Sequence, residues 1–279
     1  MALTEELQQA IVDYVKKEPR TVQDIARVIH KSWLTADSYV HQIHQKTGLV
    51  SLKTFRPGTQ GALKLVYYNY AESLRGNDLR AELFEKIRTG RFRKDFDFLE
   101  LFQFVPEASK KGIVEQSSAR GKLYTTRIIP AYQQAQSVIY CFSGNLSFVN
   151  VQRNQLRFVD VLEDLLRRKV RVKILCRVTL ASLNNIRELE PLLKKYPEFI
   201  EVRHCCQPLR GFIIDDQLAM FRDEESLQMY REGELEKDTM LYYEIYDAEW
   251  IAWLQKVFWN LFRFSLDYTN RLREIQKLT

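Results

Sequence analysis

The spacing of apolar residues changes from a helical period to a strand-like one at Gly48, and this change most constrains the fold of the first 70 residues. Before Gly48, apolar side chains recur every three or four positions in three short stretches. After it, two runs rich in β-branched and aromatic residues, 49–55 and 63–69, flank a segment of turn formers. The sequence therefore predicts three short helices followed by a β-hairpin.

Capping and helix-breaking residues set the ends of the predicted helices. The first covers residues 3–18 and stops at Pro19. Thr21 caps the second, which runs to about residue 29. Thr35 is the natural cap of the third, which continues to about residue 46 and ends at Gly48.

This order of elements resembles the winged helix-turn-helix domain, here spanning residues 1–72. Such a domain offers one helix to the major groove of DNA and lays a hairpin on the adjacent backbone. The amides of glutamine can pair with adenine, and basic hairpin residues can reach phosphates. The predicted DNA-binding residues are Ser38, His41, Gln42, Gln45 and Lys46 on the third helix, and Lys53, Arg56 and Lys64 in the hairpin.

A domain that binds protein through a merely solvated helix is the competing interpretation, because winged helices also serve as protein-binding modules. Asp37 is the only acidic residue between Asp24 and Glu72, which favours DNA. The net charge of +6 points the same way. Residues 1–127 hold 21 Lys and Arg against 15 Asp and Glu, whereas residues 128–279 hold equal numbers. A basic front part on a neutral back part suits nucleic-acid binding.

Residues 73–124 predict a structured helical connector, because they contain an amphipathic stretch and no Ser- or Gly-rich run. Gly90 interrupts that stretch, and the segment from Pro106 to Lys122 is the predicted hinge. Five basic residues stand close together around Gly90, and two roles stay open for them: contact with DNA phosphates, or the solvated end of a helix. They are Lys86, Arg88, Arg91, Arg93 and Lys94.

The back half, residues 125–279, alternates strand-like and helix-like segments, which predicts an α/β fold with helices on the faces of a sheet. The predicted strands include 137–142, 170–178 and 200–205, with a last one at 241–246. A long terminal helix is predicted from Asp247 to about Leu278. Apolar residues surround it as far as Leu266, so it is either a central core helix or a dimer contact.

Three segments of the back half resemble the phospholipase D-like fold, over about residues 126–264. The first is Ala135–Ile139 followed by Leu165–Leu175; the second is Pro208–Asp215; the third is Tyr243–Trp250. Active members of that superfamily carry His-x-Lys-x4-Asp, in which the histidine attacks phosphorus and the lysine neutralises the phosphate. The resemblance therefore implies a phosphodiester-cleaving scaffold.

The matching positions of this chain hold a degenerate motif. Pro208 stands at the histidine position, Arg210 at the lysine and Asp215 at the aspartate, and Glu244 also has a family counterpart. Because proline has no nucleophilic side-chain atom, phosphoryl transfer through this motif is excluded and no catalytic residue is predicted. Arg210 and Asp215 are expected to form a structural pair, and a residual anion- or sugar-binding cleft is the alternative. His204 lies four residues earlier and would need a rebuilt site to take part.

A winged helix in front of an inactive phospholipase D-like domain resembles the TrmB-like archaeal transcription regulators. That resemblance implies that the back domain dimerises or senses a small-molecule ligand, often a sugar. We expect no cofactor and no metal, because no phosphate-binding glycine loop and no metal-spaced His and Cys set is present. The four cysteines are expected to be buried, reduced thiols.

The sequence thus predicts a homodimeric, sequence-selective protein that binds double-stranded DNA, most simply a transcription regulator. The alternatives are an architectural, chromatin-type protein or a protein scaffold, and then a phosphodiesterase or nuclease with a rebuilt site. No secretion signal follows Met1 and no run nears the roughly 20 apolar residues needed to span a bilayer. We therefore expect a cytoplasmic protein without a membrane partner.

Overall fold

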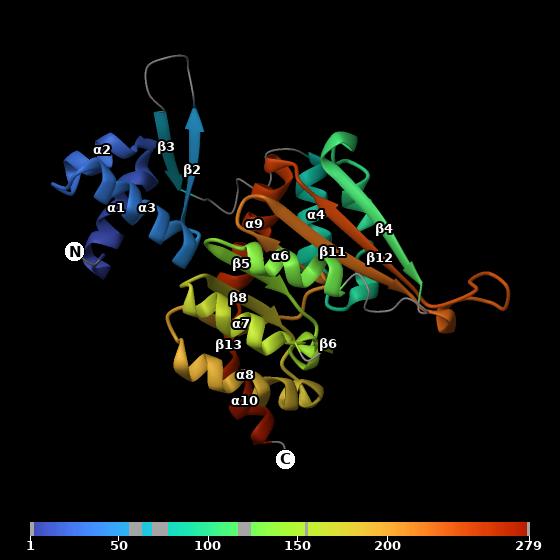
Figure 1. Ribbon diagram of the computed structural model, residues 1–279. Coiled ribbons are helices and arrows are strands. Elements are labelled where there is room, and N and C mark those ends of the chain that lie inside the picture. The colour runs from blue at the N-terminus through green and yellow to red at the C-terminus, as the bar shows by residue number, and fades with distance from the viewer. Residues whose placement is uncertain (1–2, 56–62, 69–77, 117–123, 154–155, 278–279) are drawn as a thin grey trace. The chain divides into compact units, whose positions relative to one another are not determined.

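The computed structural model describes residues 3–55, 63–68, 78–116, 124–153 and 156–277. The chain forms two compact units, Met1–Gly76 and Asn77–Thr279. Figure 1 shows a small helical unit carrying a strand pair, and a larger unit built on one broad sheet. The predicted connector, 73–124, falls almost wholly in the second unit, where its described helices pack on that sheet.

The first unit contains the three predicted helices, α1 (Glu5–Lys17), α2 (Val22–Val28) and α3 (Trp33–Thr47). Thr21 and Asp24 form a reciprocal capping box at the start of α2, which satisfies two N–H groups that the helix leaves free. The cap of α3 is Ser32 and not Thr35: its hydroxyl accepts from the N–H of Thr35 at 3.2 Å, so the helix begins nearly a turn earlier than predicted. Gly48 ends α3 with a left-handed φ of 59°.

Three antiparallel strands complete the first unit, in the order β1–β3–β2. The predicted hairpin appears as β2 (Val50–Phe55) and β3 (Leu63–Tyr68), and the two-residue β1 (Arg20–Thr21) pairs with the other edge of β3. The inward faces of the helices supply the core, with Ile25, Tyr39 and Ile43 nearly or fully buried. The outer face of α3 remains at the surface.

The second unit is built on an eight-stranded mixed sheet in the order β13-β9-β8-β5-β10-β11-β12-β4. Strands β5, β8 and β9 run parallel to one another, and every other neighbouring pair is antiparallel. The bounds are β4 Lys110–Gln116, β5 Val138–Phe142, β8 Arg171–Cys176, β9 Ile200–His204, β10 Gly211–Ile214, β11 Leu218–Glu225, β12 Thr239–Ile245 and β13 Leu266–Asp267. A separate small pair joins β6 (Gln152–Arg153) to β7 (Leu156–Arg157).

Helices cover both faces of this sheet, as the alternating pattern predicts (Figure 1). One face packs on α6 (Ile129–Gln134), α7 (Phe158–Arg167), α8 (Leu183–Lys195) and α10 (Tyr268–Gln276). The other face meets α5 (Leu99–Phe102) and α9 (Ala248–Arg263), and α4 (Asp78–Thr89) contacts α9 through Arg80. Strand β5 shows the alternation directly: Cys141 joins the first core, whereas Tyr140 and Phe142 contact Phe258 of α9.

Three expectations for the second unit are corrected. The long terminal helix is interrupted after Arg263, because Leu266 and Asp267 pair with the edge of β9 and Asp267 then caps α10. The predicted hinge contains a regular strand, β4, paired along its whole length with β12. Cys206 is exposed, although Cys141 and Cys176 are buried as expected.

The apolar circumference of α9 lies inside the second unit, with ten of its sixteen residues buried. Of the two roles left open for this helix, its burial favours a core helix over a dimer contact. Within the described residues, the model contains no helix with the length and apolarity that crossing a bilayer requires.

Candidate nucleic-acid interface and degenerate motif site

The outer face of α3 carries the residues predicted to contact DNA. Ser38, His41 and Lys46 are exposed, and Gln42 and Gln45 are half-buried. These positions lie three or four residues apart, so they share one side of the helix. The amide of Gln42 donates to the hydroxyl of Ser38 at 3.3 Å, which aligns two polar groups along that side.

Asp37, the only carboxylate on α3, is engaged by Lys64 of β3. The ammonium of Lys64 donates to both oxygens of Asp37 at 2.8 Å and lies 5.2 Å from the centre of the Trp33 ring. His41 approaches the same carboxylate, with Nε2 3.7 Å from Oδ1. In the structure Lys64 thus holds β3 against α3 and neutralises Asp37, and its expected phosphate contact stays a prediction.

The remaining hairpin candidates fall outside what can be described. The backbone of Lys53 lies in β2 opposite Leu65, but its side chain is outside the described part of the chain, and so is all of Arg56. Their expected phosphate contacts therefore stay predictions.

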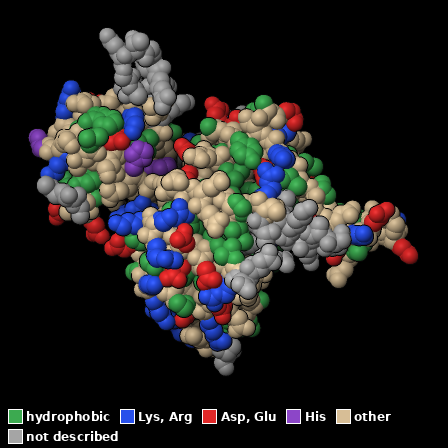
Figure 2. Space-filling model, in the orientation of Figure 1, with side chains coloured by type: hydrophobic (Ala, Val, Ile, Leu, Met, Phe, Trp, Pro, Cys, Tyr) green, Lys and Arg blue, Asp and Glu red, His purple; other side chains and the backbone are tan. Residues whose placement is uncertain are grey.

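Two surface features of the first unit escaped the sequence analysis. His44 is not a contact residue: its Nδ1 lies 2.7 Å from the carbonyl oxygen of Val50 and ties the end of α3 to β2. Leu34 is 76% exposed at the start of α3, beside the partly exposed Trp33. Exposed apolar groups at a helix start can meet the methyl group of thymine. Figure 2 shows histidine side chains (purple) at the surface of this unit.

The basic cluster around Gly90 is largely paired within the second unit. Lys86 contacts Glu82 and Glu100 at 3.1 and 2.7 Å, and Arg88 contacts Glu85 at 2.6 Å. Arg93 donates to Glu224 at 2.6 Å. Arg93 is half-buried, and the other four members, Arg91 and Lys94 included, are exposed. The structure therefore favours a solvated, ion-paired helix end for most of the cluster.

Pro208, at the position of the family's histidine, is buried under the end of α4. A Cβ atom placed on Gly90 would lie only 2.9 Å from Cγ of Pro208, so the two residues are in close contact. The neighbouring Phe98 stacks on Phe221 of β11 with ring centres 4.4 Å apart. The connector thus packs over Pro208 and over β11.

Arg210 occupies the lysine position but its guanidinium is bound to backbone. Its Nη1 donates to the carbonyl oxygens of Gln207 and Leu209 at 3.0 and 2.6 Å, and Nε would lie 2.9 Å from a Cβ on Gly144. Burial, with the nearby charge of Arg177 and other arginines, lowers the pKa of Arg210 to about 10.

Asp215, at the aspartate position, binds the start of β5 and not Arg210, so the expected pair between them is wrong. Its carboxylate accepts the backbone N–H groups of Gln136, Ser137 and Val138 at 2.9, 2.9 and 2.8 Å. It also holds a left-handed φ of 51° in the turn between β10 and β11. The physical reason is geometric: a carboxylate in this turn faces a row of free N–H donors.

Glu244 forms a buried ion pair. It is 1% exposed in β12, and both of its oxygens meet Arg127 at 2.8 Å. The hydroxyl of Tyr246 donates to the same carboxylate at 2.8 Å. The degenerate-motif residues therefore do not converge on one site: each has its own structural partner.

His204 does not reach the degenerate motif. It stands at the end of β9, three strands away from β10, or about 14 Å at the usual strand spacing. Its Nδ1 accepts the N–H of Val178 at 2.9 Å, and burial lowers the pKa of its imidazole. Among the described residues, no three His, Cys, Asp or Glu side chains gather as metal ligands.

Asp223 of β11 faces the connector. Its carboxylate accepts the N–H of Phe98 at 3.2 Å. Burial raises the pKa of Asp223 to about 6. A carboxylate in this position disfavours a bound phosphate.

Comparisons with known proteins find similarity only at the level of solved structures. No family model matches the chain, and no curated protein matches it. The structure of TrmBL2, an archaeal chromatin protein with a novel mode of DNA binding, is similar at 15% identity and a TM-score of 0.42, over 94% of this chain and 92% of that one. Nuc, a phospholipase D family member from Salmonella typhimurium, is similar at 13% identity and a TM-score of 0.39, over 57% of this chain and 98% of its own. NucT from Helicobacter pylori is similar at 15% identity and a TM-score of 0.42, over 57% of this chain and 99% of its own.

Proposed function

We propose that the first unit is a winged helix-turn-helix domain that binds double-stranded DNA with α3 in the major groove. The observation that carries this proposal is the polar outer face of α3. From Ser38 to Gln45 that face extends about 10 Å along the helix, which matches three base steps of about 3.4 Å. Because Lys64 neutralises Asp37, the face presents no uncompensated carboxylate to the phosphates.

The polar side chains divide into two groups by what they can recognise. The Gln42 amide offers a donor and an acceptor, the pattern that pairs with the edge of adenine, and His41 can donate to a base acceptor. Lys46 is a charge without such a pattern, so it suits a phosphate oxygen. The first group would give sequence selectivity, and Lys46 would give affinity.

The proposal extends to a homodimeric transcription regulator whose second unit carries out no phosphoryl transfer. Two copies would place two α3 helices in successive major grooves, about 34 Å apart. The absence of a nucleophilic atom at Pro208, and its burial beneath Gly90, support a binding role for the whole chain.

The test begins with selection of binding sites from randomised DNA duplexes by the full chain. Affinity for the selected site and for a random duplex is then measured by fluorescence anisotropy at increasing salt. Light scattering of the same sample gives the mass, which should be twice the 33.1 kDa of the chain.

Variants separate base contacts from phosphate contacts. Gln42→Ala should weaken the selected site about tenfold, the loss expected for one base pairing, and change random-duplex binding little. Lys46→Ala should weaken both and reduce the salt slope by about one. Gln9→Ala is the matched control, since Gln9 is an exposed glutamine on α1 that bonds to Asp13.

The outcomes of these measurements distinguish the regulator from its alternatives. Absence of binding to any duplex at low salt removes the proposal. Uniform binding without a selected site replaces the regulator with the architectural alternative. Cleavage of the labelled duplex would favour the nuclease alternative.

A further inference from the structure

The second unit contains a cavity of about 120 Å³ between the sheet and the helices that cover its first face. Its walls are mainly aromatic. Tyr132 of α6 meets Phe158 and Phe212 edge-on, with ring centres 4.9 and 4.7 Å away, and Met220 of β11 lies against the same space. Walls and a volume of this kind fit a compact apolar group up to about the size of a benzene ring.

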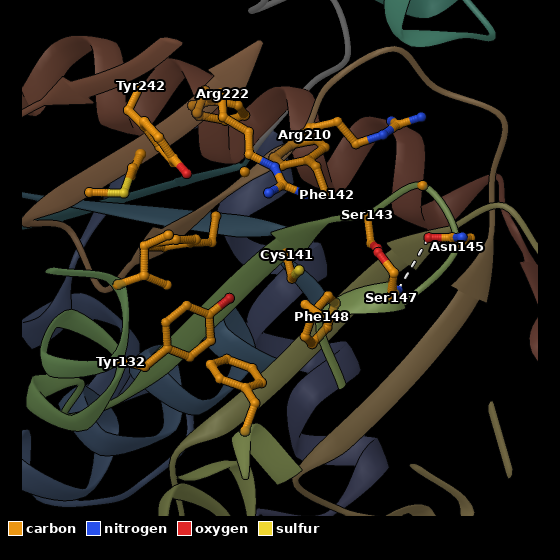
Figure 3. A pocket seen from close by; sticks show the side chains of 17 residues that line it. Tyr132, Cys141, Phe142, Ser143, Asn145, Ser147, Phe148, Arg210, Arg222 and Tyr242 are labelled. Atoms are coloured by element: carbon orange, nitrogen blue, oxygen red, sulfur yellow. Dashed lines mark hydrogen bonds between the residues drawn. The ribbon is translucent and has the colours of Figure 1, made fainter. Parts of the chain in front are cut away.

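Two guanidinium groups supply the charge of this cavity. Figure 3 shows the Arg222 side chain entering it beside the hydroxyl of Tyr242 and directed toward Cys141, whereas Arg210 points away at the rim near Ser143. The backbones of the two arginines are joined, since the N–H of Arg222 donates to the carbonyl of Arg210 at 2.8 Å. The cavity therefore has one inward cation and one at its edge.

No acid balances these charges at the cavity wall. Among the described residues that line it, none is Asp or Glu, and no described carboxylate lies within ion-pair distance of Arg222 or Arg210. Glu115 accepts from Tyr242 at 3.3 Å but does not line the cavity. Around Arg210, Arg177 adds further positive charge, Arg93 is paired with Glu224, and Asp223 supplies an opposing charge.

Such a wall favours an anionic ligand. A partly buried guanidinium is incompletely hydrated, and the like charges near it repel it. A bound anion would offset both effects and so lower the free energy of the protein. A carboxylate matches the planar fork of an arginine with two parallel hydrogen bonds.

We propose that this cavity binds a small organic carboxylate, with the carboxylate on Arg222 and an aromatic or short aliphatic body among Tyr132, Phe158 and Phe212. Besides the arginines and the phenols, the polar side chains of the walls are Ser143, Asn145 and Ser147; the hydroxyl of Ser143 and the amide oxygen of Asn145 already accept backbone N–H groups. Inorganic phosphate, which needs donors on every side, fits them poorly. A neutral molecule of the same shape would leave Arg222 without a counter-charge.

The experiment uses the full chain without DNA, so its result is independent of the proposed DNA binding. Phenylacetate is the probe, 2-phenylethanol its neutral counterpart and inorganic phosphate the anion without an apolar body. Thermal unfolding and isothermal titration calorimetry are run with each. Phenylacetate should raise the midpoint of unfolding in proportion to the logarithm of its concentration, and the other two should not. This comparison requires no variant.

Substitutions then locate the site. Arg222→Gln should weaken phenylacetate binding at least about tenfold, as the loss of a charge-assisted hydrogen bond predicts. Arg222→Lys keeps the charge but lacks the planar fork, so its affinity for phenylacetate should lie between those of the parent chain and Arg222→Gln. Arg187→Gln is the matched control, because Arg187 is exposed on α8 and bonds only to Asn184. Millimolar phenylacetate that fails to bind, phosphate that binds in its place, or an Arg222→Gln chain that binds as tightly as the parent would each overturn the proposal.

Discussion

Asp215 should be a stabilising residue of the second unit and not a remnant without a role. Its carboxylate accepts three backbone N–H groups at the entrance to β5, a central strand of the sheet. Asp215→Ala removes all three hydrogen bonds at once. It also places alanine at a φ of 51°, where a side chain without a polar group is less favourable than aspartate.

The magnitude follows from these contacts. A hydrogen bond to a charged group contributes about 1.5–3 kcal/mol when it is shielded from water. The site is only half-buried, so water can replace part of the loss. We expect Asp215→Ala to lower the free energy of unfolding by about 3 kcal/mol. Asp215→Gly loses the same acceptors but tolerates the positive φ, so it should cost about 1 kcal/mol less than alanine.

Urea unfolding followed by tryptophan fluorescence provides the measurement, because Trp250, Trp253 and Trp259 all lie in α9 of the second unit. Asp216→Ala is the control: Asp216 is the exposed neighbour, and none of the three N–H groups is bonded to it. If the free energy of unfolding of Asp215→Ala lies within about 0.5 kcal/mol of that of the parent chain, as is typical of surface substitutions, then the three hydrogen bonds do not hold β5.

Three further outcomes are expected. Thr21→Ala removes one half of the capping box and should destabilise the first unit by about 1 kcal/mol, measured by urea unfolding followed by far-UV circular dichroism. Pro208→His should not confer hydrolysis of bis(p-nitrophenyl) phosphate, because the imidazole would lie beneath Gly90; appearance of the yellow product would contradict this. Burial raises the pKa of Asp223 to about 6, above its unfolded value, so its ionisation lowers the stability as the pH rises from about 4 through 6 and leaves it lower above that. Asp223→Asn should therefore stabilise the second unit by about 1 kcal/mol near pH 7.5 and have little effect at pH 4, as paired urea titrations would show.

Local pattern was enough to predict the helices and strands with strong periodicity. The run of Val, Ile, Tyr and Phe at 138–142 predicted β5, and the stripe through Leu162 and Leu165 predicted α7. Short or polar elements gave no such pattern. Strand β1 has two residues, and β4 reads Lys-Lys-Gly-Ile-Val-Glu-Gln, so only the neighbouring strand makes it regular.

Pairings between distant residues could not be predicted from spacing. The donors to Asp215 lie 77–79 positions earlier, and Arg127 lies 117 positions before Glu244. The break after α9 also depends on distant residues, because Leu266 and Asp267 pair with β9 instead of continuing the helix. The face of α3 was predicted because its residues share one helix, whereas the engagement of Lys64 by Asp37 depends on how β3 packs.

The degenerate motif shows why correct spacing does not by itself indicate chemistry. Arg210 and Asp215 keep their separation because they flank the short strand β10, whose four residues set that distance whatever the ends do. One end binds backbone carbonyls, and the other binds backbone N–H groups. A lone imidazole at 208 would still lie against Gly90. Restoring a phosphate site would therefore require the connector to move as well as one residue to change.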